Sequence, residues 1–110
     1  MKLYYSPGAC SLSPHIVSRE LGLNLELKKV DTKDKTVEDG GDYWQVNPRG
    51  YVPALVLDNG ETLTENIAIL DWVAHRAPRL APQGEFAHTR LLEMLAFISS
   101  EVHKQFSPLF

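Results

Sequence analysis

The first eleven residues, Met1-Lys2-Leu3-Tyr4-Tyr5-Ser6-Pro7-Gly8-Ala9-Cys10-Ser11, indicate a strand, a tight turn and the start of a helix. Leucine and tyrosine fill the segment from Lys2 to Tyr5, and a Ser-Pro-Gly turn ends it, so these residues predict a first strand. Cys10, the only cysteine of the chain, then lies where a helix is expected to begin. Unpaired N–H groups and partial positive charge at a helix N-terminus favour a thiolate or an anionic sulfur ligand.

The alternative for Cys10 is a buried, inert thiol, which is common for free cysteines. The strand-turn-helix setting favours a functional thiol instead. Ser13 stands where a Cys-x-x-Cys motif would have its second thiol, so no internal disulfide can form. Any disulfide chemistry at Cys10 must therefore involve another molecule.

After Cys10, apolar residues recur at helical spacing over residues 12–21, and Gly22 is well placed to end that helix. Pro14 falls in the first turn, where a missing N–H is tolerated. Residues 25–30 predict a second, partly exposed strand. The three elements together predict a βαβ unit.

The second half of this domain follows a polar loop over residues 31–42, for which we expect at most a short helix. Residues 52–57 predict a buried strand, and Asp58-Asn59-Gly60 is a strong hairpin signal before a short strand at residues 62–63. Thr64 is expected to be the N-cap of a further helix, with Glu65 in its first turn. That helix carries an apolar stripe of Ile67, Leu70, Val73 and Ala74.

The last segment is helical and separate. Pro78 and Pro82 mark a linker over residues 78–85, between a first domain at residues 1–77 and a long amphipathic helix that starts near Phe86 in residues 86–110. The expected fold class is α/β, a βαβ-ββα domain followed by the start of an all-α domain.

Composition excludes several classes of function. The 110 residues are 44% hydrophobic and 23% charged, with a net charge of -3, which is ordinary for a globular domain. No basic stripe could neutralise a phosphate backbone, so we expect no nucleic-acid partner. No apolar run approaches the roughly 20 residues of a membrane span, and we expect a cytoplasmic protein without membrane contact. The four histidines are scattered in the sequence, and we predict no metal.

Two further features point to a peptide ligand. Pro53 lies at the start of a predicted strand. If the Val52-Pro53 bond is cis, the backbone of Val52 would offer its N–H and C=O to an extended peptide. The alternative is that an isolated proline in a strand marks only the edge of a sheet. Glu65 and Asn66 lie at a helix N-terminus, which favours a carboxylate ligand, while Glu65 could pair with an ammonium group. Acidic residues are also common there for stability alone. With Cys10, these sites suit a tripeptide that carries a thiol.

Four motifs resemble the beta class of bacterial glutathione S-transferases over the whole chain: Tyr5-Ser6-Pro7-Gly8-Ala9-Cys10-Ser11, Asn47-Pro48-Arg49-Gly50-Tyr51-Val52-Pro53-Ala54-Leu55, Leu63-Thr64-Glu65-Asn66, and the segment from Glu101 to Phe110. The resemblance implies a thioredoxin-like, glutathione-binding domain followed by the first helix of an all-helical domain.

The resemblance also implies roles for individual residues. Cys10 would face the glutathione sulfur and His103 would tune it, these two forming the catalytic pair, with Ser100 on the same helical face as His103. Lys35 would reach the glycyl carboxylate, Val52 would pair with the cysteinyl backbone, and Glu65 with Asn66 would hold the γ-glutamyl end. The implied glutathione-binding set is Ala9, Cys10, Ser11, Lys35, Tyr51, Val52, Pro53, Glu65, Asn66, Ser100 and His103.

The implied activity is a glutathione transferase of detoxification, which activates the glutathione thiol and conjugates it to small hydrophobic electrophiles. Glutathione would be a co-substrate, with no prosthetic group, and the protein would be a homodimer. Class members are longer, so the helical domain is expected to be truncated here. The class often has asparagine where this chain has Ala96.

Two other functions fit the same residues. Cys10 could act as the nucleophile of a glutathione-dependent thiol-disulfide oxidoreductase, which requires an accessible thiolate. A non-catalytic interaction module built on the same fold would neither bind glutathione nor turn over.

Overall fold

The computed structural model describes residues 1–110, which divide into two compact units, Met1–Val73 and Ala74–Phe110. The first unit contains a five-stranded sheet of order β3-β2-β1-β4-β5. Its strands are β1 (Lys2–Tyr5), β2 (Glu26–Asp31), β3 (Thr36–Val37), β4 (Ala54–Val56) and β5 (Thr62–Thr64). β1 pairs in parallel with β2 and antiparallel with β4, so the sheet is mixed.

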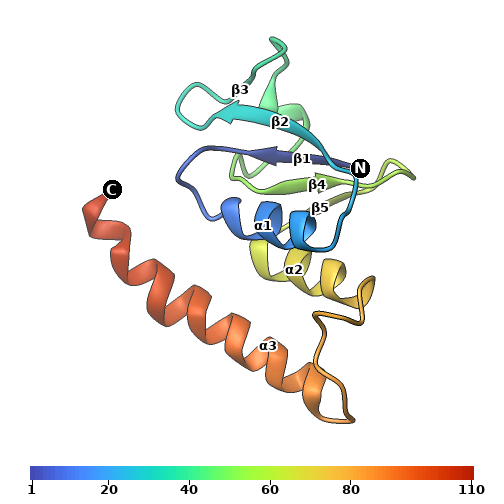
Figure 1. Ribbon diagram of the computed structural model, residues 1–110. Helices are drawn as coiled ribbons and strands as arrows, with labels where there is room; N and C mark the ends of the chain where they lie inside the picture. Colours follow the sequence, from blue (N-terminus) through green and yellow to red (C-terminus); the bar gives the residue numbers. More distant parts are fainter. The chain divides into compact units, whose positions relative to one another are not determined.

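Helices α1 (Leu12–Glu20) and α2 (Asn66–His75) lie on the same side of the sheet in Figure 1. A cluster of Leu3, Leu55, Ile69 and Val73 forms the core on that face, because alternate residues of β1 and β4 point to one side. The parallel β1-α1-β2 connection confirms the predicted βαβ unit. The thioredoxin-like α/β fold class is therefore confirmed.

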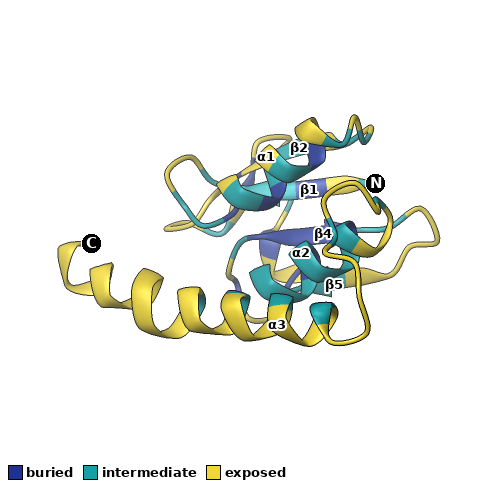
Figure 2. Cartoon of the chain, turned by 60° about the horizontal axis from the view of Figure 1, so that its bottom comes forward, coloured by how far each residue is buried: buried dark blue, intermediate teal, exposed yellow.

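The opposite face of the sheet carries a second core of Val30, Val37, Tyr43 and Ala54. A short 3₁₀ helix, η1 (Tyr43–Gln45), brings Tyr43 into it, and the Asp42 side chain caps that helix by accepting from the Trp44 N–H. Figure 2 shows the buried residues gathered in the strands and on the inner sides of the helices of this unit.

Two local details differ from the sequence expectation. Residues 31–42 contain the strand β3, paired antiparallel with β2, and the helical turn η1 follows this segment. Thr64 ends β5, and the carbonyl of Glu65 accepts the first bond of α2 from the Ile69 N–H, so Glu65 rather than Thr64 is the N-cap residue. Thr64 pairs with Ala54 as the last residue of β5, so the strand ends one residue before the position from which α2 begins.

The second unit contains α3 (Ala87–Phe97), which continues into a π-helical segment, η2 (Ile98–Val102), and a 3₁₀ segment, η3 (His103–Leu109). None of the three has a buried residue, as the exposed colouring of this helix shows in Figure 2. No helix of the chain has both the length and the apolar content that crossing a bilayer requires.

Candidate functional site

The turn between β1 and α1 places Cys10 beside the loop that precedes β4. Cys10 is half-buried, and its Sγ lies 3.5 Å from the carbonyl oxygen of Val52. The Cys10 carbonyl accepts hydrogen bonds from the backbone N–H of Ser13 at 3.1 Å and from the Ser13 hydroxyl at 2.9 Å. The turn therefore holds the thiol just before the first turn of α1, where helix N–H groups favour a thiolate.

Ser11 supports this turn from inside the protein. Its side chain is fully buried, and its hydroxyl accepts from the Ser6 N–H at 3.1 Å and donates to the Ser6 carbonyl at 3.2 Å. Both hydrogen-bonding functions of the hydroxyl are thus used to join the end of β1 to the start of α1. Ser11 can offer a ligand only its backbone, whereas Ala9 lies half-buried in the same turn.

The backbone of Val52 lies just before β4, beyond the end of the hydrogen-bonded ladder between β1 and β4. The register of β1 with β4 ends at the pair Tyr4 and Ala54, and the Val52-Pro53 peptide bond is cis, as the peptide-binding hypothesis required. Pro53 is buried, whereas Val52 is half-buried. Val52 therefore has the position at which an extended peptide could add as a further strand.

Two residues that the sequence analysis did not single out support this loop. The Tyr43 hydroxyl donates to the Tyr51 carbonyl at 2.7 Å, and the Asn47 amide donates to the same oxygen at 2.8 Å. Burial raises the pKa of Tyr43 to about 12, so its hydroxyl stays protonated and can donate. The available signal was the Asn-Pro-Arg-Gly turn, because asparagine commonly bonds the backbone two residues ahead, as Asn47 does with the Arg49 N–H at 3.0 Å.

We expect Asn47→Ala to lower the free energy of unfolding by about 1–3 kcal/mol, because the change removes a buried side chain that satisfies both Arg49 and Tyr51. Urea denaturation followed by circular dichroism measures the change. The matched control is Asn24→Ala at an exposed position between α1 and β2, for which we expect a change within about 0.5 kcal/mol. Equal effects of the two substitutions would contradict the role of Asn47.

Lys35 is held over the same loop. Its Nζ donates to the Gly50 carbonyl at 2.8 Å and lies 5.7 Å from the ring centroid of Trp44 and 5.8 Å from that of Tyr51. Aromatic faces attract an ammonium group at such distances. Tyr51 is 70% exposed, so the group that these rings position remains next to solvent.

The turn before Lys35 is built by Asp31. The Asp31 carboxylate accepts from the N–H groups of Lys33 and Asp34 at 2.9 and 3.0 Å. These backbone hydrogen bonds hold the pKa of Asp31 below its usual value, that from Asp34 having the larger effect. Lys35 follows in the left-handed region with a φ of 58°.

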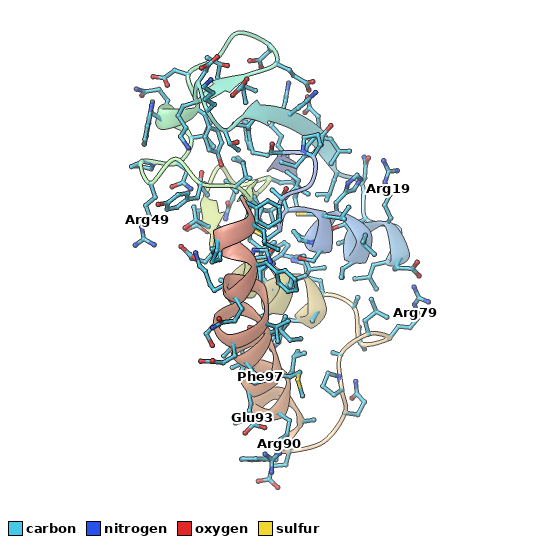
Figure 3. The ribbon with its side chains drawn as sticks, turned by 90° about the vertical axis from the view of Figure 1, so that its left-hand side faces the viewer. Arg19, Arg49, Arg79, Arg90, Glu93 and Phe97 are labelled. Atoms are coloured by element: carbon cyan, nitrogen blue, oxygen red, sulfur yellow. The ribbon has the colours of Figure 1, made fainter.

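Glu65 and Asn66 lie at the start of α2. Glu65 has a φ of 72°, and its carboxylate lies 3.2 Å from the Arg49 guanidinium. Figure 3 shows the Arg49 side chain projecting outward from the loop. Both side chains are about two-thirds exposed, so this pair contributes little to stability. Arg49 was missed because a lone arginine in a turn has no sequence signal.

Asn66 connects α2 to the turn that holds Cys10. Its Nδ2 donates at 2.9 Å to the hydroxyl of Ser13, which itself donates to the Cys10 carbonyl. The Asn66 Oδ1 is buried without a hydrogen-bond partner. Ser13, the residue in place of a second cysteine, is thus a structural link.

Ser100 and His103 belong to the second unit, and both are exposed. The Ser100 hydroxyl donates to the carbonyl of Ala96 at 2.9 Å. Ser100 lies in the π-helical segment and His103 begins the 3₁₀ segment. We expected these two side chains to share one helical face because residues three apart do so in an α-helix. A π-helical turn contains more residues than an α-helical turn, so the same spacing gives a different angle between the two side chains.

Five of the predicted residues lie in or contact the segment of residues 49–52. Lys35 contacts Gly50, Cys10 contacts Val52, and Glu65 contacts Arg49. Tyr51 is held through its backbone carbonyl, which accepts a hydrogen bond from the Tyr43 hydroxyl. The region thus combines a cation, a carboxylate at a helix start, a thiol and a strand-end backbone. This combination suits a short peptide with a thiol, an ammonium group and carboxylates.

One family model and several known proteins are similar to this chain. The sequence profile of the family described as glutathione S-transferase, N-terminal domain, matches residues 8–76. Glutathione S-transferase GstA of Escherichia coli O157:H7 is 48% identical over 113 residues, which cover 100% of this chain and 56% of that protein.

Solved structures are similar over the whole chain. A ternary complex of BphK, a bacterial GST, is 60% identical with a TM-score of 0.95. A sphingomonad glutathione S-transferase complexed with glutathione is 55% identical with a TM-score of 0.94, and a bacterial beta class enzyme of Sphingomonas chungbukensis is 54% identical with a TM-score of 0.95. In all three the match covers 100% of this chain and 56% of the other. The chain spans about half the length of the relatives it matches.

Proposed function

Because the chain belongs to the glutathione S-transferase family, with the predicted resemblance to the bacterial beta class confirmed, we propose that the protein is a glutathione transferase. It binds glutathione, stabilises the thiolate and transfers it to small hydrophobic electrophiles. The observation that carries this proposal is the meeting of Cys10, Val52, Lys35 and Glu65 around residues 49–52.

Each part of the tripeptide has a chemically suitable partner at this loop. The backbone of Val52 would pair with the cysteinyl residue as an added strand, which directs the glutathione sulfur toward Cys10. The Lys35 ammonium would bind the glycyl carboxylate. The N–H groups at the start of α2 would bind the γ-glutamyl carboxylate, and Glu65 would bind its ammonium. Asn66, Tyr51, Pro53, Ala9 and the backbone of Ser11 complete the proposed contacts.

The proposed reaction needs only a stabilised thiolate. Glutathione releases its thiol proton to solvent, and helix N–H groups stabilise the resulting negative charge. Each unit by which they lower the thiol pKa corresponds to roughly 1.4 kcal/mol of this stabilisation. The thiolate then forms a C–S bond at an electrophilic carbon, and the leaving group departs with its bonding electron pair. His103 and Ser100 are proposed to assist at the sulfur, on the family resemblance alone.

A second function is favoured by one observation, the half-buried position of the Cys10 thiol directly before α1. A thiolate there could attack a mixed disulfide of glutathione and form a disulfide with glutathione, as the former partner leaves as a thiolate. The residue choice Cys-x-x-Ser allows this exchange and excludes an internal disulfide.

The test of both functions compares the protein with its Cys10→Ala variant, by the rate of glutathione addition to a chloronitrobenzene and by the rate of exchange with a mixed disulfide of glutathione. We expect conjugation that survives in Cys10→Ala within about tenfold, because the sulfur of glutathione is the nucleophile in the proposed reaction. Loss of disulfide exchange in the same variant would assign that reaction to Cys10. Absence of conjugation from both proteins would contradict the proposed transferase.

The location, the oligomeric state and the cofactor requirement are proposed on the same family resemblance. We propose a cytoplasmic homodimer that uses glutathione as a co-substrate and needs no prosthetic group. Size-exclusion chromatography with light scattering tests the dimer directly, and a monomer at micromolar concentration would contradict it.

A further inference from the structure

We propose that Ser13 is a positioning residue of the glutathione site, and that its hydroxyl joins the two ends of that site. One end is the start of α2, where Glu65 and Asn66 lie, and the other is the turn that holds Cys10. The inference rests on the proposed function, because it concerns the placement of the same ligand. All these residues belong to the unit from Met1 to Val73.

The first observation is a continuous series of hydrogen bonds, which we call the Ser13 relay. The Asn66 Nδ2 donates at 2.9 Å to the hydroxyl of Ser13, which lies 53 positions earlier in the sequence. That hydroxyl donates in turn to the Cys10 carbonyl at 2.9 Å. Both bonds are partly buried, and a hydrogen bond is stronger where less water surrounds it. The relay therefore ties α2 to the residue that carries the thiol.

The second observation is the direction of these bonds. A serine hydroxyl has one proton, and that of Ser13 goes to the Cys10 carbonyl, so the oxygen must accept from its other neighbour. The Asn66 side chain meets this requirement with its NH₂ group. Ser13 therefore fixes the orientation of the Asn66 amide as well as the backbone of Cys10, and alanine at this position would release both.

At the thiol end, the relay acts on the backbone of Cys10. The Cys10 carbonyl accepts from the Ser13 N–H at 3.1 Å and from the Ser13 hydroxyl at 2.9 Å, so the hydroxyl provides one of two bonds that hold this carbonyl. The turn in this position keeps the thiol before the N–H groups at the start of α1, which have no partner within the helix. Loss of the hydroxyl would loosen the thiol without removing any proposed ligand contact.

At the other end, the relay holds a strained segment. Glu65 has a φ of 72°, which is unfavourable for a residue other than glycine and persists only where surrounding contacts hold it. Asn66 follows Glu65 directly, and its bond to Ser13 is such a contact. In the proposed binding mode the γ-glutamyl group lies here and the sulfur lies near Cys10. A fixed separation of the two ends would strengthen binding, because less ordering is then needed when the ligand binds.

The first test is a calorimetric titration with glutathione of the protein, of Ser13→Ala and of Ser13→Thr, which keeps a hydroxyl. We expect about tenfold weaker binding for Ser13→Ala, because two hydrogen bonds are lost, and binding within about threefold of the unsubstituted protein for Ser13→Thr. Ser18→Ala is the matched control, because Ser18 is a buried serine on the same helix, and its effect should stay within about twofold. Urea denaturation establishes that each variant is folded during the titration.

The second test measures the alkylation of Cys10 by iodoacetamide and needs no glutathione. Cys10 is the only thiol, so the reaction reports on this turn alone. For Ser13→Ala we expect the pH profile to move to higher pH and the rate at pH 7 to fall at least threefold, because a loosened turn weakens the contact with helix N–H groups that favour the thiolate. Ser13→Thr should restore the profile. Asn66→Ala should have an effect similar to that of Ser13→Ala, although it changes a different element.

A double-mutant cycle separates the relay from two unrelated effects. Because Asn66→Ala already removes the donor to Ser13, adding Ser13→Ala should slow alkylation by less than about twofold further. The same comparison applies to the affinity for glutathione. Full multiplication of the two single effects in the double variant would contradict the relay.

The possible results distinguish this inference from the proposed function. A protein that binds no glutathione contradicts the proposed function, and the alkylation profiles still decide whether Ser13 positions Cys10. Unchanged affinity and unchanged alkylation in folded Ser13→Ala overturn the inference and leave the proposed function intact. A lower urea midpoint without either change would make Ser13 a structural residue only, which overturns it too. If Ser13→Ala fails to fold, the alkylation of Asn66→Ala provides the same decision.

Discussion

Ile69→Ala is expected to lower the free energy of unfolding by about 2–5 kcal/mol, the usual cost of truncating a fully buried aliphatic side chain. Ile69 is 0% exposed and packs with Leu3 and Leu55, so its removal leaves a cavity between α2 and the sheet. Its N–H also makes the first backbone bond of α2, to the Glu65 carbonyl at 3.0 Å. Because the cavity would loosen α2, which begins at Asn66 directly after Glu65, we expect weaker glutathione binding as well as lower stability.

Ile16→Ala is the matched control for this prediction. Ile16 lies on α1 of the same unit and is 51% exposed, so truncation there should change stability by no more than about 1 kcal/mol. Urea denaturation of both variants, followed by far-ultraviolet circular dichroism, gives the comparison. A loss for Ile69→Ala no larger than that for Ile16→Ala would contradict the packing described for α2.

Gly50→Ala is expected to damage both the stability and the proposed glutathione site. Gly50 has a φ of 72°, and a Cβ there would lie 2.7 and 2.9 Å from Cζ3 and Cη2 of Trp44. The left-handed backbone costs a non-glycine residue about 1–2 kcal/mol, and the collision adds an overpacking cost of about 1–3 kcal/mol. Displacement of Trp44 would also release Lys35, which lies over its ring.

The measurements are the urea midpoint and the KM for glutathione, which we expect to rise about tenfold, equal to roughly 1.4 kcal/mol of lost binding. Gly60→Ala is the matched control, because Gly60 has a φ of 88° and its Cβ would meet nothing within 4 Å. It should show the backbone cost without the collision and without the change in KM. Equal behaviour of the two variants would mean that Trp44 does not hold Lys35 in place.

The regular elements were predictable because their signals are local. The strand at Lys2–Tyr5, the helix from Leu12 and the Asp58-Asn59-Gly60 hairpin follow from apolar periodicity and turn residues, and the structure contains all three. The strand β3 was not predictable, because its two residues become a strand only by pairing with β2. Thr64 was wrongly assigned as an N-cap because its pairing with Ala54 in the sheet overrides its local preference.

The candidate site was predictable in part. Cys10, Val52 and Glu65 were found because a thiol before a helix, a proline at a strand start and an acidic residue at a helix start have recognisable local patterns. Asn47, Tyr43 and Arg49 were missed because their roles consist of contacts with residues that no local pattern connects to them.

Local sequence patterns were enough to predict the order of the elements, the family resemblance and the kinds of chemical group available for a thiol-bearing ligand. Which of these groups come into contact is seen in the folded chain alone: Cys10 with Val52, Lys35 with Gly50, Arg49 with Glu65 and His75 with His88. The physical reason is that backbone propensity and hydrophobic period act over a few residues. Contacts between distant residues depend instead on the strand order and on the packing of helices that the whole chain specifies together.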